Sequence, residues 1–451
     1  MGARLQLFWG RWAEIRADEW VTEVLHYGYR IPFMSTPPLA SEPIPFQSYH
    51  HNTERFEVLD AEIADMEKKQ AIEEVRVPGP GFYSRMFVVP RASGGFRPVT
   101  DLSLLNKYIN LSKFKIETSK MVLSSIRKGD WMVSIDLKDA YFHIPIHPDS
   151  RKYLRFVWKG RVWQFRSLCF GLSTAPQVFT RVMASVAAAL HREGYRVLRY
   201  LDDWLILHEE ETGIALARDR TLFWCDHLGL LVNRRKSLLI PTNIITYLGM
   251  VIHSVPMMAF PTQDRVDRMR KTLSLFLKDS NLPAGVWLRL LGHLSSLEKL
   301  VPGGRLRMRA LQFCLNEAWS RSQDKDHRVK PSREALRDLV WWNADENIWK
   351  GLSLQAVNPE FTLFTDASST GWGGAMQDLV ASGEWSVEEK DLHINVLELR
   401  AVRRVLETFV QEVRGKALTL MADNSTALAY IKNQGGTKSK ALFREAQVLF
   451  G

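Results

Sequence analysis

Apolar residues in the first half of the chain form short runs of the kind that β-strands bury. One run covers residues 131–135, and two more lie within residues 196–207, where they are joined at Asp202-Asp203. Runs at residues 86–89 and 96–99 flank Ser93-Gly94-Gly95, which favours a hairpin because glycine supplies the positive φ of a tight turn. Strands and helical patterns alternate throughout residues 112–258, so we expect a mixed α/β core there.

Helical spacing appears on both sides of this core. Residues 57–74 have a charged helical pattern. Residues 262–300 place apolar side chains at i, i+3, i+4 and i+7, which predicts two amphipathic helices separated by Pro283 and Gly285. The positions expected to face their core are Val266, Met269, Leu273, Phe276, Leu277, Trp287, Leu290, Leu291 and Leu294. A further helix is predicted at residues 332–342, with Leu336, Leu339 and Val340 as its apolar face.

An α/β pattern begins again after Asn358-Pro359. It predicts a strand at residues 361–365, a glycine-rich turn, a helix at 396–410, a strand at 418–421 and a helix at 425–433. At the other end of the chain, residues 1–60 hold three tryptophans and a proline-rich stretch that suits neither regular helix nor a central strand. We expect that segment to pack onto the body as an extension.

Composition indicates a folded protein with an unevenly distributed excess of basic residues. The chain has 451 residues, of which 46% are hydrophobic and 24% charged, and this composition excludes a disordered tail or a fibre. The formal net charge is +10, and residues 261–350 contribute 17 Lys/Arg against 11 Asp/Glu. Such a basic segment suits a nucleic-acid backbone, although a solvated helical face is the alternative that charge alone slightly favours.

Other features bear on compartment and on metal type. Cys169, Cys225 and Cys314 lie far apart without paired cysteines or histidines, so neither a disulfide framework nor a zinc site is indicated. The longest apolar stretches fall short of the roughly 18–20 residues that span a bilayer, and no targeting signal is evident. We therefore expect an intracellular protein without a membrane partner.

Three acids in the first half are candidates for metal binding. Asp136 ends an apolar run, and Asp202 and Asp203 occupy a predicted hairpin tip. Neighbouring carboxylates beside an apolar sheet repel each other and raise each other's pKa, and a divalent cation with a preference for oxygen ligands, such as Mg²⁺, would remove that cost. The alternative is that the Asp-Asp pair only supplies turn chemistry.

The strings YLDDW, SIDLKDAYFHIPI and SLCFGLSTAPQVF resemble the palm motifs of reverse transcriptases in order and spacing. RMFVVPRASGGFRPVTDLSLLN is similar to the fingers hairpin of that family, LGLLVNRRKS to the following palm segment, and YLGMVI to the primer-grip hairpin. Within the family, the resemblance is to long-terminal-repeat-like elements, particularly DIRS-type retrotransposons that use a tyrosine recombinase. HINVLELRA and DNSTALAYIKNQGG carry this narrower assignment.

The resemblance implies roles for individual residues. Asp136 and Asp202 would be the principal metal ligands, with Asp203 beside them and the Leu137 carbonyl available to one ion. Tyr141 would exclude a ribose 2′-hydroxyl, although an ordinary core tyrosine is the alternative. The other implied nucleotide contacts are Arg91 and Arg97 from the hairpin, the backbone N–H groups of Asp139, Ala140 and Tyr141, the Phe170-Gly171 turn, and Lys236 as a general acid. Solvated arginines and a solvated Arg234-Arg235-Lys236 cluster are the alternatives for the basic residues.

Three acids in the tail resemble a second family. TDASSTGWGG, LELRAV and ADNSTAL are similar to the first three acidic blocks of ribonuclease H, which implies that Asp366, Glu398 and Asp423 hold two Mg²⁺ ions. A capping box from Asn395 to Glu398 and a cap by Asp423 are the alternatives. The fourth acid of that family has no counterpart before the last residue, Gly451, and we expect apolar surface to be exposed around residues 442–450.

Together these observations predict an α/β (α+β palm) right-hand polymerase with fingers, palm and thumb, followed by a truncated ribonuclease H-like α/β domain. The expected division is an extension at 1–56, fingers and palm at 57–258, a thumb at 259–330, a helical tether at 331–358 and the ribonuclease H-like domain at 359–451. The resemblance implies an RNA-directed DNA polymerase that uses two Mg²⁺ ions per site, with Mn²⁺ as an alternative. Its expected partners are an RNA template, a DNA primer, an RNA–DNA hybrid and dNTPs. An inactive nucleic-acid binder and an RNA-directed RNA polymerase are the competing hypotheses.

Overall fold

The structure is a computed structural model that describes residues 2–45, 53–90, 95–279, 281–320 and 324–450. The chain forms two compact units, Met1–Ile245 and Thr246–Gly451, and each is described by itself.

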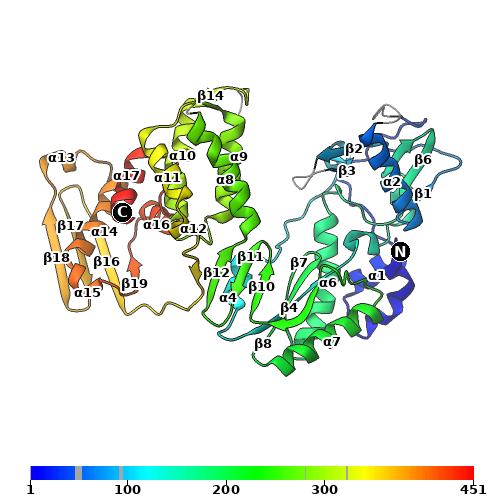
Figure 1. The fold of residues 1–451 in the computed structure, drawn as a ribbon, viewed down its shortest axis with the longest axis horizontal. Helices are drawn as coiled ribbons and strands as arrows, with labels where there is room; N and C mark the ends of the chain where they lie inside the picture. The colour runs from blue at the N-terminus through cyan, green and yellow to red at the C-terminus, as the bar shows by residue number, and fades with distance from the viewer. Residues whose placement is uncertain (1, 46–52, 91–94, 280, 321–323, 451) are drawn as a thin grey trace. The chain divides into compact units, whose positions relative to one another are not determined.

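The centre of the first unit is a four-stranded antiparallel sheet in the order β7-β8-β4-β9. Its strands are β4 (Trp131–Asp136), β7 (Arg196–Tyr200), β8 (Asp203–His208) and β9 (Leu238–Thr242). Helices α6 (Ala175–Arg192) and α7 (Glu211–His227) pack against β7 and β8 (Figure 1). Ile135, Trp204 and Ile206 are at most 1% exposed, so the sheet has a dry core beneath it. The predicted α/β core is confirmed.

A second group of strands lies earlier in this unit. β2 (Arg85–Pro90) and β3 (Phe96–Asp101) form the predicted hairpin, whose tip at residues 91–94 lies outside the described residues. β1 (Ile72–Glu74), β5 (Arg155–Trp158) and β6 (Arg161–Phe165) form an antiparallel sheet in the order β1-β6-β5. The helix predicted at residues 57–74 extends beyond the end of the observed helix. α2 covers Glu54–Lys68, and Gln70 then takes a φ of 58°, which turns the chain into β1.

The amino-terminal residues pack onto the body, as predicted. They form the 3₁₀ helix η1 (Arg4–Ala13) and α1 (Glu19–Tyr27), which Asp18 caps by accepting a hydrogen bond from Val21 N–H. Leu5 and Trp12 are fully buried in the core that also holds the palm-like sheet. The remaining short helices of the unit are α3 (Ser103–Asn106), α4 (Ser119–Ser125), η2 (Ala140–His143) and α5 (Pro148–Arg151).

The chain passes into the second unit within β10 (Ile244–Tyr247). There β11 (Met250–His253), β12 (Met258–Pro261) and β15 (Leu352–Ser353) are neighbours in one sheet. The helices that follow are α8 (Gln263–Lys278), α9 (Ala284–Leu297), α10 (Gly304–Ala318), α11 (Arg333–Asn343) and α12 (Asp345–Ile348). Two short strands, β13 (Leu282–Pro283) and β14 (Arg328–Val329), pair between them.

These helices share one core around Trp287 and Trp342, each fully buried. The two amphipathic helices predicted within residues 262–300 are confirmed as α8 and α9, although Gly285 lies in the first turn of α9 and not between them. Leu277 is 56% exposed, so its assignment to the apolar face was wrong. Residues 331–358 contribute α11 and α12 to the same core through Leu339 and Ile348.

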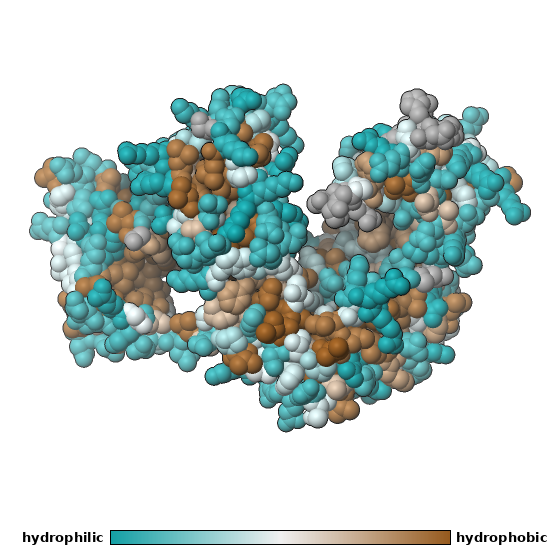
Figure 2. Space-filling view, in the orientation of Figure 1, coloured by the Kyte–Doolittle hydropathy of each residue, from teal (hydrophilic) through white to brown (hydrophobic). Residues whose placement is uncertain are grey.

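The predicted apolar face of α11 needs correction. Leu339 is buried, but Leu336 and Val340 are 42% and 65% exposed. The helix instead turns Ala335, Asp338 and Trp342 inward, and Arg307 from α10 pairs with the buried Asp338. Figure 2 shows apolar surface in brown over the region where Figure 1 labels α10 and α11.

The tail forms its own sheet in the order β18-β17-β16-β19, in which β16 and β19 are parallel. The strands are β16 (Phe361–Ala367), β17 (Gly371–Met376), β18 (Leu379–Glu384) and β19 (Leu418–Met421). The helices are α13 (Val387–Lys390), α14 (Ile394–Thr408), α15 (Val410–Val413), α16 (Ser425–Lys432) and α17 (Lys440–Phe450). α14 packs against β16 and β17.

Two expectations for the tail were wrong. The glycine-rich segment is a strand and not simply a turn, since residues 371–376 form β17. A Cβ on Gly374 would lie 2.5 Å from Cγ2 of Val405, so glycine lets α14 approach the sheet. Residues 442–450 are also less exposed than predicted, because Leu442, Phe443 and Ala446 are buried against α14, α16 and α10.

Within the described ranges, no helix is both long enough and apolar enough to cross a membrane.

Candidate active sites

The register of the central sheet brings the first three acids together. Asp136 is the last residue of β4, and it lies directly opposite Asp203, the first residue of β8. Asp202 occupies the turn between β7 and β8, where its carbonyl accepts a hydrogen bond of 3.0 Å from Leu137 N–H. Acids that are 66 positions apart in the sequence, Asp136 and Asp202, therefore share one sheet edge (202 − 136).

The turn that carries Asp202 is strained. Tyr200 and Asp203 are paired, so only Leu201 and Asp202 connect the two strands. Leu201 has a φ of 55°, a left-handed conformation that costs a non-glycine residue roughly 1–2 kcal/mol. The next residues along β8, Trp204 to Leu207, are at most 1% exposed and hold the turn in place. Strain of this kind concentrates where function requires a fixed geometry.

Burial and mutual repulsion raise the pKa of two of these acids. Burial raises the pKa of Asp203 to about 6, and the charges of Asp202 and Asp136 add to the effect. Burial also raises the pKa of Asp202, with a further contribution from Asp136. The charge of Lys236 acts in the opposite direction on both carboxyls. A divalent cation bound by these oxygens would remove the repulsion, so the residues fit a metal site.

The segment after β4 presents unpaired backbone donors. Asp139 has a left-handed conformation (φ 50°, ψ 42°) and begins η2. Within the part of the chain that the structure describes, the N–H groups of Asp139, Ala140 and Tyr141 have no hydrogen-bond partner. Lys69 at the end of α2 donates a hydrogen bond of 3.2 Å to Asp139 Oδ1. Successive free N–H groups in such a turn form a concave site for anions. We call residues 139–143 the nucleotide turn.

Aromatic rings line the space beside the nucleotide turn. The Tyr141 ring lies 4.8 Å from that of Phe170 and 5.5 Å from that of Phe179, centroid to centroid. Burial raises the pKa of Tyr141 to about 12, and the charges of Asp202 and Tyr200 add to the effect, so the phenol stays protonated. Phe170 is 59% exposed and available to a ligand.

The Phe170-Gly171 turn is fastened to the neighbouring hairpin. Gly171 has a φ of 94°, and its carbonyl accepts a hydrogen bond of 2.8 Å from Asn106 Nδ2. A Cβ at this position would lie 2.7 Å from the carbonyl oxygen of Thr100 on β3. This close approach of two backbones requires glycine.

Several functional contacts were not anticipated from the sequence. Ser237 Oγ accepts a hydrogen bond of 3.0 Å from Asp136 N–H, and Asn233 N–H donates to the Asp136 carbonyl at 2.8 Å. His143 is 1% exposed and lies between Ala140 O and Leu231 N–H, each 3.0 Å from one ring nitrogen. The only sequence signal for Lys69 is its position. It follows the last residue of α2, and the next residue, Gln70, turns the chain away from the helix.

The basic residues expected to bind nucleic acid or nucleotide lie on the β2–β3 hairpin and on α8. Arg91 and the side chain of Arg97 lie outside the described residues. Of the basic residues on α8, Arg268 pairs with Asp264, Arg270 with Asp345, and Arg265 donates to Leu248 O. Lys271 is exposed. The basic face expected of α8 is therefore mostly engaged within the protein.

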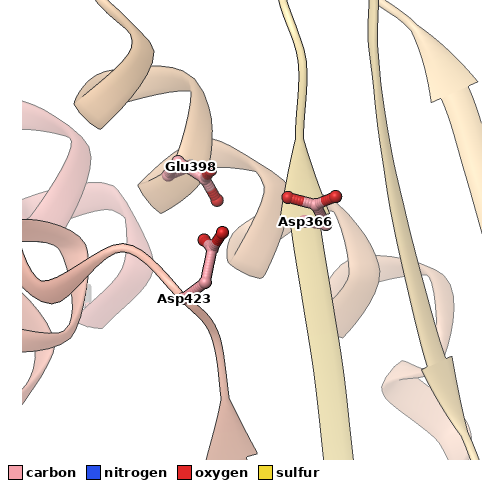
Figure 3. Close-up of side chains that lie close together, drawn as sticks. All are labelled: Asp366, Glu398 and Asp423. Atoms are coloured by element: carbon pink, nitrogen blue, oxygen red, sulfur yellow. The ribbon is translucent and has the colours of Figure 1, made fainter.

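The tail brings its three acids together more closely. Asp366 lies on β16, Asp423 follows the parallel neighbour β19, and Glu398 projects from α14. One ligand oxygen from each lies within 4.8 Å of the others. Figure 3 shows Glu398 and Asp423 directed toward one another, with Asp366 beside them. Burial raises the pKa of Glu398 to about 7, and the charges of Asp423 and Asp366 contribute.

Capping does not explain these acids. His393 caps α14 by accepting from Asn395 N–H, and Asn424 caps α16 by accepting from Ala427 N–H. Oε2 of Glu398 is buried without a hydrogen-bond partner. An orphaned carboxylate oxygen between two other acids fits a cation site, and both capping alternatives were wrong.

The one acid that follows Asp423 in the sequence has another role. Glu445 on α17 is 4% exposed and accepts hydrogen bonds from Arg400 and Arg403 of α14 at 2.8–3.0 Å. It fastens α17 to the helix that carries Glu398, so it is engaged as a structural ion pair.

Comparison with protein families assigns a class to the first site. Residues 89–252 match the sequence model of the family described as reverse transcriptase (RNA-dependent DNA polymerase). This segment contains the three acids Asp136, Asp202 and Asp203 together with the nucleotide turn. Residues 89–252 are thus similar to a reverse transcriptase domain.

Sequence relatives of the chain include viral polyproteins. The chain is 24% identical to the genome polyprotein of Petunia vein clearing virus (isolate Shepherd) over 328 residues, which are 70% of this chain and 14% of that protein. It is 24% identical over 402 residues to the putative enzymatic polyprotein of Cassava vein mosaic virus, covering 84% of this chain and 58% of that protein. It spans less than two thirds of either relative.

Solved structures agree on the fold. The foamy viral protease-reverse transcriptase in complex with dsDNA aligns with a TM-score of 0.61 at 17% identity, over 100% of this chain and 95% of that one. The same protein in complex with an RNA/DNA hybrid aligns with a TM-score of 0.59 at 16% identity, over 99% and 61% of the two chains. The fold is therefore that of a right-hand polymerase with mixed α/β content, as the sequence predicted.

Proposed function

We propose that this protein is an RNA-directed DNA polymerase that adds dNTPs to a primer 3′-hydroxyl. The observation that carries the proposal is the shared sheet edge of Asp136, Asp202 and Asp203 inside the reverse transcriptase domain. Asp136 and Asp202 would hold Mg²⁺, with Asp203 beside them and the Leu137 carbonyl available to one ion. When bound, such ions supply activation of the 3′-hydroxyl and stabilisation of the leaving pyrophosphate.

The chain's own residues position the nucleotide. The free N–H groups of Asp139, Ala140 and Tyr141 bind phosphate oxygens, and Arg91 and Arg97 add positive charge from the hairpin. The Tyr141 ring, fixed by Phe170 and Phe179, occupies the space that a ribose 2′-hydroxyl would need. Phe170-Gly171 provides an apolar contact to the nucleotide. Lys236 is the proton donor to the leaving group, and its charge already acts on Asp202 and Asp203.

We further propose that the tail is a ribonuclease H-like domain that degrades the RNA strand of an RNA–DNA hybrid. Asp366, Glu398 and Asp423 would hold two Mg²⁺ ions, and the orphaned oxygen of Glu398 supports this assignment. The solved relatives were complexes with dsDNA and with an RNA/DNA hybrid, which supports RNA template, DNA primer and hybrid as partners of this chain. The narrower assignment to a DIRS-type retrotransposon rests on the tail motifs.

The test is extension of an oligo(dT) primer on poly(rA) in Mg²⁺, with dTTP and UTP supplied separately. We expect incorporation of dTTP alone, loss of it in Asp202→Asn, and full retention in the matched variant Asp366→Asn, whose acid belongs to the other site. Incorporation of UTP would indicate an RNA polymerase instead. Tight binding of primer–template without extension by either substrate would indicate an inactive nucleic-acid binder.

A further inference from the structure

The amino-terminal residues make hydrogen bonds to three segments that surround the nucleotide turn. We define Gly2, Ala3, Arg4 and Trp12 as the amino-terminal brace. Gly2 N–H donates to Lys69 O at 2.5 Å, and Ala3 N–H donates to Phe142 O at 2.7 Å. Arg4 Nε donates to Gly229 O at 2.9 Å, and Trp12 Nε1 donates to Leu228 O at 3.2 Å.

Each of these acceptors lies in the nucleotide turn or in a segment that is hydrogen-bonded to it. Lys69, whose carbonyl is bound by Gly2, pairs with Asp139 through its side chain at 3.2 Å. Phe142 belongs to η2 itself. The loop that includes Leu228 and Gly229 continues to Leu231, which accepts from Lys138 N–H at 2.8 Å and donates to His143 at 3.0 Å. The brace therefore holds the turn from both sides.

Close packing shows that the brace is a built contact. A Cβ on Gly2 would lie 2.2 Å from the carbonyl oxygen of Gln70, so only glycine fits. Ala3 takes a left-handed φ of 58° and is 4% exposed, and Trp12 is fully buried. A strained alanine persists only where its surroundings determine its conformation.

We propose that the amino-terminal brace is a positioning element for nucleotide binding. It fixes Lys69 and η2 so that the N–H groups of residues 139–141 stay aimed at the triphosphate. This inference rests on the proposed function, because it assigns the turn to a nucleotide. The brace lies outside residues 89–252, the part of the chain that matches the reverse transcriptase family.

The test compares Gly2→Ala with the matched control Gly10→Ala, in which a Cβ meets nothing within 4 Å. Loss of about one hydrogen bond at the turn predicts about a fivefold rise in the KM for dTTP in Gly2→Ala. We expect kcat and the Kd for primer–template to stay within about twofold, because the acids and the template surface are untouched. Hydrogen exchange of the amides in residues 138–146 should be faster in Gly2→Ala and unchanged in Gly10→Ala.

An unchanged KM and unchanged exchange in a folded Gly2→Ala protein would overturn the proposal. A rise in KM accompanied by equal losses in kcat and in primer–template binding would also overturn it, because that pattern indicates general destabilisation. If Gly2→Ala does not fold, Arg4→Met replaces it, since methionine keeps the apolar stem and removes the bond to Gly229 O together with the guanidinium over the Phe8 ring. If the unchanged protein incorporates no nucleotide, the proposed function fails. The exchange measurement then still decides whether the brace holds the turn.

Discussion

His143 provides a test of the geometry around the nucleotide turn. Its ring is 1% exposed, with Nδ1 3.0 Å from Ala140 O and Nε2 3.0 Å from Leu231 N–H. A neutral ring that donates from Nδ1 and accepts at Nε2 satisfies both partners, whereas a protonated ring would direct a second donor at an N–H group. Burial lowers the pKa of His143 to about 4, against the raising effects of Ala140 O and Asp139.

The sign of the pH dependence follows from this lowered pKa. Between pH 6.5 and 4 the unfolded chain binds a proton at His143 and the folded chain does not, so stability falls as the pH falls. The complete shift corresponds to about 3 kcal/mol, and about 2 kcal/mol of it is lost between pH 7 and pH 5. Above about pH 7 the contribution is constant.

The assay compares the protein with His143→Gln, whose amide can donate and accept but does not titrate. Urea unfolding of the full chain is followed at pH 7 and pH 5, with hydrogen exchange identifying the transition of the first unit. The loss of stability on acidification should be about 2 kcal/mol smaller in the variant. Carboxyls such as Asp203 titrate in both proteins and cancel in this difference. A direct readout is exchange of the His143 C2 proton, which reports the pKa of the ring.

Two results would refute the reasoning. The first is a His143 ring that titrates near 6.5, which would mean that the ring is hydrated or paired with an acid. The second is an equal loss of stability in the protein and in His143→Gln between pH 7 and pH 5, which would mean that the histidine is not held neutral by its two backbone partners.

Three further predictions address the other sites. Tyr141→Ala should weaken the discrimination against UTP relative to dTTP by about tenfold or more in single-nucleotide incorporation, because the excluded volume is lost. Glu398→Gln should abolish hybrid cleavage. It should also raise the free energy of unfolding at pH 8 by about 2–3 kcal/mol in urea unfolding, since a carboxyl with a pKa near 7 is destabilising once ionised. This stabilisation should vanish near pH 4.5. Gly374→Ala should lower stability by about 1–3 kcal/mol through its clash with Val405, whereas Gly292→Ala, which meets nothing within 4 Å, should be neutral or stabilising.

The acid-bearing strands were predictable because their signal is local. The apolar residues of β4 and β8 directly border Asp136 and Asp203, and strand ends at one edge of a sheet converge. The tail acids were predictable in the same way from the runs before Asp366 and Asp423. Motif spacing then added the fold, which the solved relatives bear out.

Other features depend on contacts that leave no local pattern. β17 was missed because glycine has low strand propensity, and the approach of Val405 explains the glycine at position 374. The inward turn of Asp338 on α11 depends on Arg307, which lies 31 positions earlier. The amino-terminal brace binds backbone carbonyls, and a carbonyl is the same for every residue type. Such contacts cannot be inferred from side-chain patterns.

The polymerase-type site concentrates features that cost folding free energy. Asp139 and Leu201 have φ values of 50° and 55°, the N–H groups of residues 139–141 have no partner among the described residues, and burial and repulsion raise the pKa of Asp203. Each feature favours the unfolded chain, and a bound polyanion with its cations would relieve the carboxylate repulsion and the unpaired N–H groups. The surrounding structure offsets these costs through Trp204 beneath the acids and Trp12 behind the turn, both fully buried. A strained site that is supported by its surroundings is preorganised, because a ligand finds its donors and acceptors already in position. The supporting residues therefore include Trp12, which lies far outside the acidic motifs in the sequence.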